Sequence, residues 1–358
     1  MRKRVLLCVA LSILLECTES TGLPTAAREK SFDDNEKCGC LIVGLQGRAY
    51  VKPARSPRYI STKLNMAVFE GDFLQVTESS KAMLACGEAF KELTSGVHPV
   101  PCSSGEAGPI GVGTRIVDPG MVRGDFPRLL SPRTGKLLDA HPRFRWTPVT
   151  DATKYSIRVR GPNVDWRATV TSNEIVYPND APALVAGPPY KVTIFAARRG
   201  SSDDEGVQGL EFTILGAQDA EKVRAREREI KNLNLGEASK RLLIAYLYAS
   251  YNLNAEAIMQ LNEASGDQET VRVLAELYLR NLLPNKAEEQ YSKVVELAGE
   301  DILGRALAYD RLGQIYEARS KNDQAMQKYQ NALKLYVDLE DWNKVRDFAL
   351  RLSELQKR

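Results

Sequence analysis

The chain has 358 residues, of which 43% are hydrophobic and 27% are charged, as in ordinary globular proteins of two or three domains. Lys and Arg number 49 against 46 Asp and Glu, and the two signs are interspersed, so composition does not indicate a nucleic-acid partner. Only two histidines occur, His98 and His141, each followed by a proline, and this scarcity disfavours catalysis or metal binding centred on histidine.

The first residues predict an export signal. Basic residues at positions 2–4 precede a mostly apolar run over 5–15, which is too short to span a membrane. We expect residues 1–20 to be removed, with cleavage after Gly22 as an alternative; lipidation of Cys17 is a less favoured reading. No later stretch reaches about 18 apolar residues. The mature chain is therefore expected outside the cytoplasm, in the periplasm or cell envelope.

Four cysteines then fall within one short segment: Cys38, Cys40, Cys86 and Cys102. In an oxidising compartment such cysteines are expected to form disulfides, and four cysteines allow three pairings. We predict a Cys86–Cys102 disulfide, because Cys86 ends a predicted strand and Cys102 follows a return bracketed by prolines. The partners of Cys38 and Cys40 stay open.

Residues 21–37 predict a disordered lead-in, and residues 38–115 predict a small β domain of short strands separated by Gly, Pro and Ser. The segment opens with Val-Gly-x-x-Gly-x-Ala-x-Val at positions 43–51, continues with Phe-Glu-Gly-Asp-Phe-Leu at 69–74, and ends in a Thr- and Ser-containing strand. It resembles the periplasmic domain of FecR-type proteins, in which a Gly-Asp turn precedes a Thr-rich strand.

Residues 116–140 predict a linker rich in Pro and Gly. The glycines at 108–113 lack the Lys-Ser/Thr of a phosphate-binding loop and are interpreted as turns.

Residues 141–216 predict a second β domain with alternating apolar residues. The run from Phe144 and Trp146 to Tyr155 resembles strands B and C of fibronectin type III modules, and Leu184 to Tyr190 resembles their tyrosine corner. We expect Trp146 to pack near Tyr155 in the core. The acidic cluster at 203–205 is interpreted as a solvated hairpin tip.

Residues 217–358 predict an array of helical hairpins. Three copies carry small and aromatic residues at matching positions: Ile244, Ala245, Tyr248, Ala257 and Leu261; Leu274, Ala275, Tyr278, Ala287 and Tyr291; and Leu312, Gly313, Tyr316, Ala325 and Tyr329. The pattern resembles the tetratricopeptide repeat. A lead-in helix over 219–233 and a capping helix over 341–355, with Trp342 on its apolar stripe, complete the array.

The resemblance implies that the first helix of each pair lines a groove that binds a protein or peptide. Six positions are expected to face outward there: Tyr246, Arg272, Glu276, Arg280, Asp310 and Gln314. Arg272 and Arg280 would clamp a carboxylate or backbone carbonyls, with Tyr246 as an apolar anchor. The alternative is that these side chains are solvated and paired within one helix.

Together these features predict a multidomain β + α chain, in which two small all-β domains precede an α-helical tetratricopeptide solenoid. The predicted function is that of an exported, non-enzymatic scaffold for a protein partner. We expect no catalytic residue, metal or cofactor. The alternatives are a cell-envelope glycan-binding protein, which would use the FecR-like domain, and, less favoured, a wall-modifying enzyme.

Overall fold

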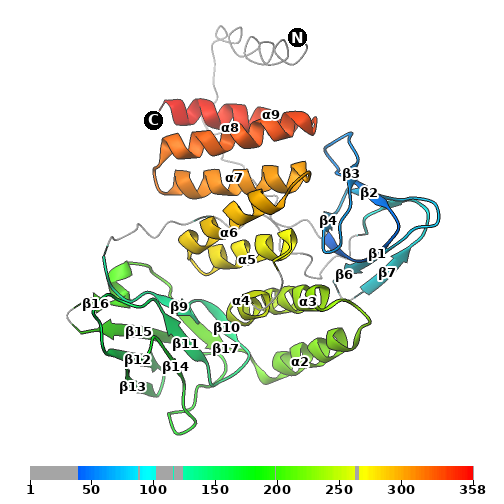
Figure 1. Ribbon diagram of the computed structural model, residues 1–358. Coiled ribbons are helices and arrows are strands. Elements are labelled where there is room, and N and C mark those ends of the chain that lie inside the picture. The colour runs from blue at the N-terminus through cyan, green and yellow to red at the C-terminus, as the bar shows by residue number, and fades with distance from the viewer. Residues whose placement is uncertain are drawn as a thin grey trace, which may run out of the picture. The chain divides into compact units, whose positions relative to one another are not determined.

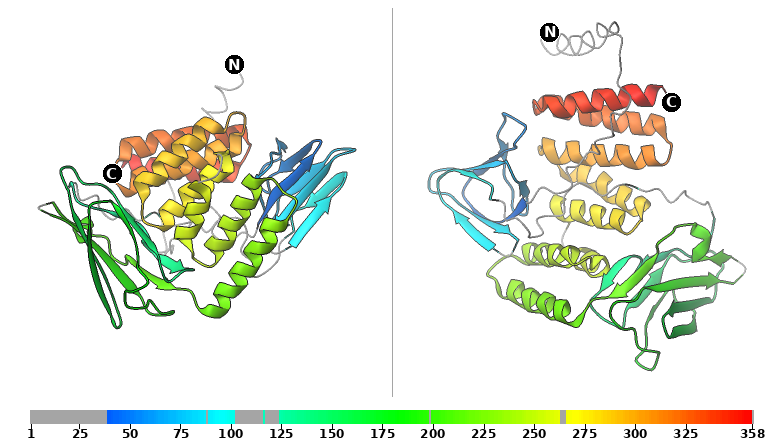
Figure 2. Two further views of the ribbon diagram at one scale, coloured as in Figure 1. Left: turned by 60° about the horizontal axis from the view of Figure 1, so that its bottom comes forward. Right: turned by 180° about the vertical axis from the view of Figure 1, so that it is seen from behind.

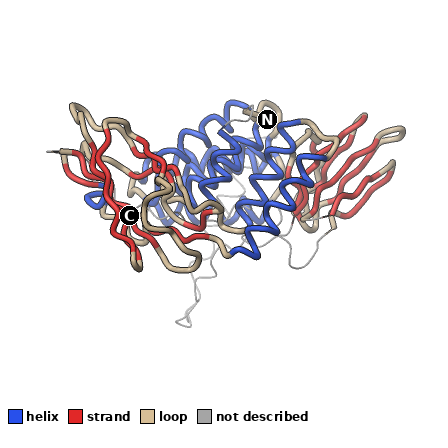
Figure 3. Tube along the Cα trace, turned by 90° about the horizontal axis from the view of Figure 1, so that it is seen from below, coloured by secondary structure: helices blue, strands red, loops and turns tan. Residues whose placement is uncertain are grey.

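The computed structural model describes residues 39–87, 89–101, 116, 124–197, 199–262 and 266–357. These residues belong to one compact unit. The predicted signal, the lead-in, Cys38 and Cys102 lie outside the described residues. The predicted fold class is confirmed: the described chain forms strands as far as Ile214, and helices follow from Ala217 onward (Figures 1 and 3). No helix among the described residues is both long enough and apolar enough to cross a membrane.

The first β domain consists of two antiparallel four-stranded sheets, in the orders β4-β1-β6-β7 and β3-β2-β5-β8. The Gly-Asp turn lies between β4 and β5: Asp72 accepts hydrogen bonds from the backbone N–H groups of Ala54 and Phe69, both at 2.9 Å. The strands are β1 (Gly39–Gln46), β2 (Ala49–Lys52), β3 (Ile60–Ser61), β4 (Ala67–Phe69), β5 (Phe73–Val76), β6 (Lys81–Cys86), β7 (Ala89–Leu93) and β8 (Gly96–Pro99).

The disulfide in this domain differs from the predicted one. Cys86 is bonded to Cys40, not to Cys102. Strands β1 and β6 are antiparallel neighbours, with Leu41 opposite Ala85. This register places Cys40 opposite Cys86 although 46 residues separate them. The prediction was wrong because it assumed a local loop, whereas pairing of distant strands decides which cysteines meet.

The second β domain is a sandwich of two sheets, β14-β11-β9 and β10-β17-β15-β12-β13, with β16 paired to β15. Two of its strands, β9 and β10, lie inside the predicted 116–140 linker, so the domain begins earlier than expected. The strands are β9 (Leu129–Ser131), β10 (Gly135–Leu137), β11 (Arg143–Trp146), β12 (Tyr155–Gly161), β13 (Val164–Val170), β14 (Glu174–Val176), β15 (Tyr190–Ala196), β16 (Gly200–Ser201) and β17 (Glu211–Ile214), with a short 3-10 helix η1 (Ser202–Glu205).

The core of the sandwich follows the sequence pattern. Trp146 is fully buried, and its ring lies 5.6 Å from that of Tyr155, as predicted. The tyrosine corner is also present, because the Tyr190 hydroxyl accepts a hydrogen bond from the Val185 N–H at 2.8 Å. These aromatic residues are therefore part of the core.

Eight helices among the described residues form the array and follow one another in chain order (Figure 2). They are α2 (Ala217–Asn232), α3 (Glu237–Ser250), α4 (Asn254–Asn262), α5 (Gln268–Arg280), α6 (Pro284–Leu297), α7 (Ile302–Ala318), α8 (Asn322–Asp338) and α9 (Trp342–Gln356).

One turn recurs through the array. The carbonyls of Tyr248, Tyr278, Tyr316 and Tyr336 each accept a hydrogen bond from the N–H five residues later. The residue before each of these donors has positive φ: Asn252, Leu282, Ser320 and Glu340. This is the Schellman ending of a helix, repeated four times in the described array. The repeated turn is why successive helices reverse direction in the same way.

Small residues allow the paired helices to approach each other closely. A Cβ added to Gly313 of α7 would lie 2.4 Å from the Tyr329 ring of α8. Ala325 and Ala332 of α8 are fully buried beside that ring. In α9, Phe348 and Leu352 are buried as expected, but Trp342 is 53% exposed and does not belong to the inner stripe.

The first β domain packs against the helices through one face of its β1–β6 sheet. Leu41, Val43 and Ala85 share a buried cluster with residues of α3 and α5, whereas Cys40 and Ile42 point into the domain's own core. Alternation along β1 thus buries both faces of the sheet, which explains the unbroken apolar run of this strand.

Polar contacts of the first β domain reach far along the array. Asn65 accepts from Ser239 of α3 at 2.7 Å and donates to Asp267, the N-cap of α5, at 3.2 Å. Ser56 donates to the Leu339 carbonyl between α8 and α9 at 2.6 Å. One small domain therefore contacts the array near its beginning and near its end.

Candidate protein-interaction site

The structure buries most of the predicted groove residues. Tyr246, Arg272, Glu276 and Asp310 are each at most 8% exposed, whereas Arg280 and Gln314 are partly exposed. The expectation that all six face outward is therefore wrong for four of them. Their side chains are enclosed between helices, where they form two hydrogen-bonded networks.

The first network joins α3 to α5. Arg272 donates two hydrogen bonds to the Glu269 carboxylate, both at 2.7 Å, and the Tyr246 hydroxyl donates to the same carboxylate at 2.6 Å. Burial opposes the charge on Arg272, but the attraction of Glu269 outweighs it, so the pKa of Arg272 is raised. Both donors are thus occupied within the chain.

The second network joins α5, α6 and α7. Arg311 donates to both carboxylate oxygens of the fully buried Glu276, at 2.9 and 2.7 Å, and Tyr291 donates to the same carboxylate. Gln314 accepts from Arg311 at 2.8 Å and donates to Asp310 at 2.7 Å. Glu276 therefore pairs with the next repeat, and not with Arg272 or Arg280 in its own helix as the alternative supposed.

These networks set the spacing of neighbouring repeats. Breaking one partner of a buried ion pair leaves an uncompensated charge and costs about 3–5 kcal/mol. Substituting Arg272 or Glu276 would thus destabilise the array, and a loss of binding in such a variant would not identify a contact residue.

Arg280 differs from the other five positions. It lies in the last turn of α5, and its guanidinium forms no hydrogen bond or ion pair with any side chain that the structure describes. Burial lowers the pKa of Arg280, partly opposed by the attraction of Glu276, whose carboxylate is already bound by Arg311. A partly buried guanidinium that lacks a carboxylate gains hydrogen bonds and charge compensation when a ligand supplies one.

Matching positions of successive copies, Ala245, Ala275 and Gly313, are 30 and then 38 residues apart, and a pocket of about 490 Å³ lies at the shorter interval, between α4, α5 and α6. The residues that line it come from the second half of α4, from the segment leading into α5 and α5 itself, and from the side of α6. Leu261, Val271 and Leu274 give the pocket apolar walls, and Lys293 and Leu297 also line it.

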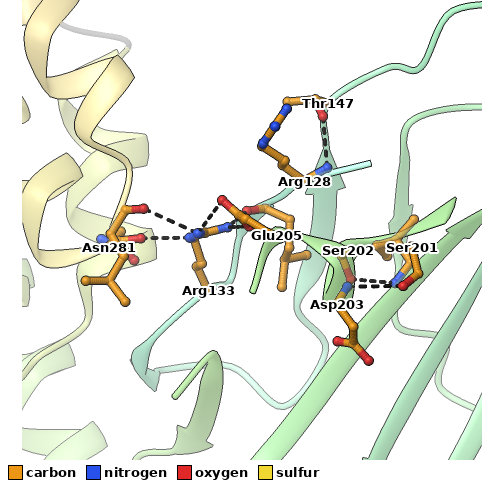
Figure 4. Close-up of polar contacts among 11 residues, drawn as sticks. Arg128, Arg133, Thr147, Ser201, Ser202, Asp203, Glu205 and Asn281 are labelled. Atoms are coloured by element: carbon orange, nitrogen blue, oxygen red, sulfur yellow. Dashed lines mark hydrogen bonds and ion pairs between the residues drawn. The ribbon is translucent and has the colours of Figure 1, made fainter. Parts of the chain in front are cut away.

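A buried arginine, held by an ion pair that the sequence did not predict, attaches the sandwich to the array (Figure 4). The Arg133 side chain is fully buried and donates two hydrogen bonds to Glu205 of η1, both at 2.8 Å. Its Nε donates to the Asn281 carbonyl at the end of α5, at 2.8 Å. The acidic cluster at 203–205 is thus not entirely solvated: Glu205 is buried and completes this contact.

A second junction brings β10 against the turn after α3. The Lys136 N–H donates to the Asn252 carbonyl at 2.8 Å. A Cβ at Gly135 would lie 2.5 Å from that carbonyl oxygen, and Gly135 has a φ of +90°. Glycine is therefore required here for both its conformation and its size.

The described residues contain no group of three or more His, Cys, Asp or Glu side chains arranged to hold a metal ion.

Comparisons with known proteins add little. No protein family matches the sequence. No curated protein matches it either. Among solved structures, the chain is similar to the crystal structure of MamA protein at 16% sequence identity, over 38% of this chain and 82% of that chain, with a TM-score of 0.28.

Proposed function

We propose that this chain is an exported, non-enzymatic scaffold that binds a protein partner on the helical array, with Arg280 as the residue that contacts a partner carboxylate. The observation that carries the proposal is the guanidinium of Arg280, which is partly buried and unpaired among the described residues beside a saturated buried network. Desolvated charges without partners are unfavourable in a folded protein and are enriched at binding sites.

The chemistry of this position favours an Asp or Glu side chain or a chain terminus. A guanidinium binds a carboxylate through two parallel hydrogen bonds, a geometry that a lysine cannot reproduce. The surrounding array is held by intramolecular ion pairs, so the guanidinium is presented by a preorganised surface and little ordering is needed on binding.

An exported location is part of the same proposal. The Cys40–Cys86 disulfide supports it, because disulfides persist in oxidising compartments. The basic and apolar start of the sequence is consistent with this location.

The test compares two charge reversals in the full exported chain. Arg280→Glu changes the proposed contact, and Lys334→Glu makes the same change in charge at an exposed position of α8. Proteins cross-linked to each variant in an envelope extract would be quantified against wild type. We expect Arg280→Glu to deplete specific partners at least about tenfold, as for loss of a desolvated charge pair, and Lys334→Glu to deplete none.

Equal recovery with all three chains, at unchanged circular dichroism, would reject Arg280 as the contact residue. The variant Leu297→Arg tests the pocket beside α4 in the same experiment, because it places a charge on a pocket-lining residue that is 46% exposed. Depletion in this variant alone would move the binding surface to the pocket.

Glycan binding by the first β domain is the second candidate. The observation that favours it is the exposed ring of Phe73 on the β3-β2-β5-β8 sheet, which is 43% exposed and lies between the partly exposed Lys52 and the exposed Pro99. An exposed aromatic ring beside a lysine suits stacking on a sugar with a hydrogen bond to its hydroxyls. Sedimentation with purified peptidoglycan should then be weakened by Phe73→Ala and unaffected by Phe195→Ala, a residue of the sandwich that is 44% exposed.

A further inference from the structure

The outer face of α9 carries an exposed apolar stripe at the end of the described array. Trp342 is 53% exposed and Leu350 is 50% exposed, and Arg346 and Glu354 lie on the same face. These four residues are spaced four apart, so they form a single row along the helix. The end of a solenoid normally presents a polar face to water. This one presents two large apolar side chains.

The row is distinct from the face that packs on the array. Phe348, Leu352 and Leu355 are buried against α8, where the Phe348 ring stacks on Tyr336 with centroids 5.4 Å apart. Arg351 turns inward to Glu317 at 2.9 Å. The inner side of α9 is therefore occupied by contacts with the array, and no described segment covers its outer row.

The charges in the row have no partners within the described chain. Neither Arg346 nor Glu354 forms an ion pair or a hydrogen bond through its side chain there. They are eight residues apart, or about 12 Å along the helix axis, too far to pair with each other.

The order of the charges fits an antiparallel copy of the same helix. If Leu350 of one copy lies against Leu350 of a second copy, Arg346 of each lies opposite Glu354 of the other. The same alignment brings Trp342 close to Lys357 of the second copy, where the ammonium group can contact the indole face. A parallel alignment would instead place Arg346 against Arg346. Charge complementarity therefore selects one orientation.

We propose that the chain forms a two-fold symmetric homodimer through the outer face of α9, with Leu350 at the symmetry axis and two reciprocal Arg346–Glu354 ion pairs. Such an interface is self-complementary, so it closes at two copies and does not propagate into a filament. The proposal uses a surface separate from Arg280 and does not depend on the proposed partner-binding site.

The experiment measures self-association of the full chain by sedimentation equilibrium. Wild type is expected to show a monomer–dimer equilibrium that weakens with salt. Arg346→Glu and Glu354→Arg should each weaken dimerisation at least about tenfold, since each change turns two attractive pairs into two repulsive ones. The double variant Arg346→Glu/Glu354→Arg should recover the affinity of wild type to within about threefold.

Mixing the two single variants gives a further test. A mixture of Arg346→Glu and Glu354→Arg chains should form a heterodimer, because one chain then carries acidic residues at both positions and the other basic residues at both, so both pairs are attractive. Mixing should therefore recover dimerisation that neither variant shows alone, and a mixture that associates no better than the separate variants would reject the reciprocal pairing. Lys334→Glu on α8 serves as the matched control and should dimerise like wild type.

The proposal is overturned if wild type remains monomeric at about 100 µM, a concentration at which a Kd tighter than about 100 µM gives substantial dimer. It is also overturned if the single variants dimerise like wild type, or if the double variant fails to recover while its circular dichroism is unchanged.

Discussion

Removal of the Arg133 guanidinium should weaken the attachment of the sandwich to the array. Arg133→Met keeps much of the side-chain volume but leaves the Glu205 carboxylate buried without a cation. The same change removes the donors to the carbonyls of Leu129 and Asn281, which now accept at 2.7 and 2.8 Å.

The expected loss in the free energy of unfolding follows from the burial of the ion pair. Breaking one partner of a buried ion pair costs about 3–5 kcal/mol, whereas an exposed pair contributes about 1 kcal/mol or less. Arg143 and Glu174 provide a matched comparison in the same domain: their side chains also meet at 2.9 Å, but are 57% and 43% exposed. Arg143→Met should therefore change stability by less than about 1 kcal/mol.

Urea unfolding can assign the loss to the sandwich. The chain has three tryptophans, and Trp146 and Trp166 both lie in this domain. In a background of Trp342→Phe, fluorescence reports the sandwich, while circular dichroism is dominated by the helices. We expect Arg133→Met to move the fluorescence transition to lower urea than the helical transition, because the sandwich loses its contact with α5.

A double variant tests whether the uncompensated buried charge causes the loss of stability. Arg133→Met/Glu205→Met removes both buried charges, and apolar replacement of a buried pair is often neutral. It should therefore be more stable than Arg133→Met alone. If Arg133→Met cost no more than Arg143→Met, or if the double variant were the least stable chain, the buried-charge argument would be refuted.

Three further predictions concern single sites. Peptide mapping without reduction should find Cys40 linked to Cys86, and a Cys86–Cys102 peptide would contradict the assignment. Reducing the Cys40–Cys86 bond should destabilise the domain by up to about 4 kcal/mol, because the bond closes a loop between cysteines 46 residues apart. Trp146→Ala should cost about 3–5 kcal/mol, because Trp146 is fully buried against Tyr155, and a shift of less than about 1 kcal/mol in urea unfolding would argue against a core role. Burial raises the pKa of Glu256 above the ordinary glutamate value of 4.5, so the folded chain binds this proton more readily than the unfolded chain. Stability should therefore fall as pH rises from 4.5 through the raised pKa. Glu256→Gln should flatten that slope in unfolding measured across pH, and an unchanged slope would reject this role of Glu256.

The architecture was largely predictable because it rests on local periodicity. Alternation around Trp146 and Tyr155 specifies strands with one buried face, and the small residues at Gly313 and Ala325 specify where two helices meet. The residues that form each of these patterns lie close together in the sequence, so the patterns can be recognised without the structure.

The candidate site was less predictable because side-chain orientation depends on neighbouring repeats. Repeat position alone suggested that Glu276 faces outward, but it is buried by Arg311, which follows 35 residues later. The uneven spacing between copies is visible in the sequence, but the pocket beside α4 depends on which helices lie next to one another, and the spacing does not specify that. Contacts between domains, such as Arg133 with the Asn281 carbonyl, leave no periodic signal at all.

The contacts of the first β domain also bear on the mechanics of the array. A solenoid in which each repeat touches only its neighbours can stretch like a spring and can fray from either end. Here Ser239 near the start of the array and Leu339 near its end are both hydrogen-bonded to residues of one small domain, which is itself closed by the Cys40–Cys86 bond. The first β domain therefore connects helices near both ends of the array. Extension of the array would have to break these contacts first, so the array is expected to resist tension as a single body.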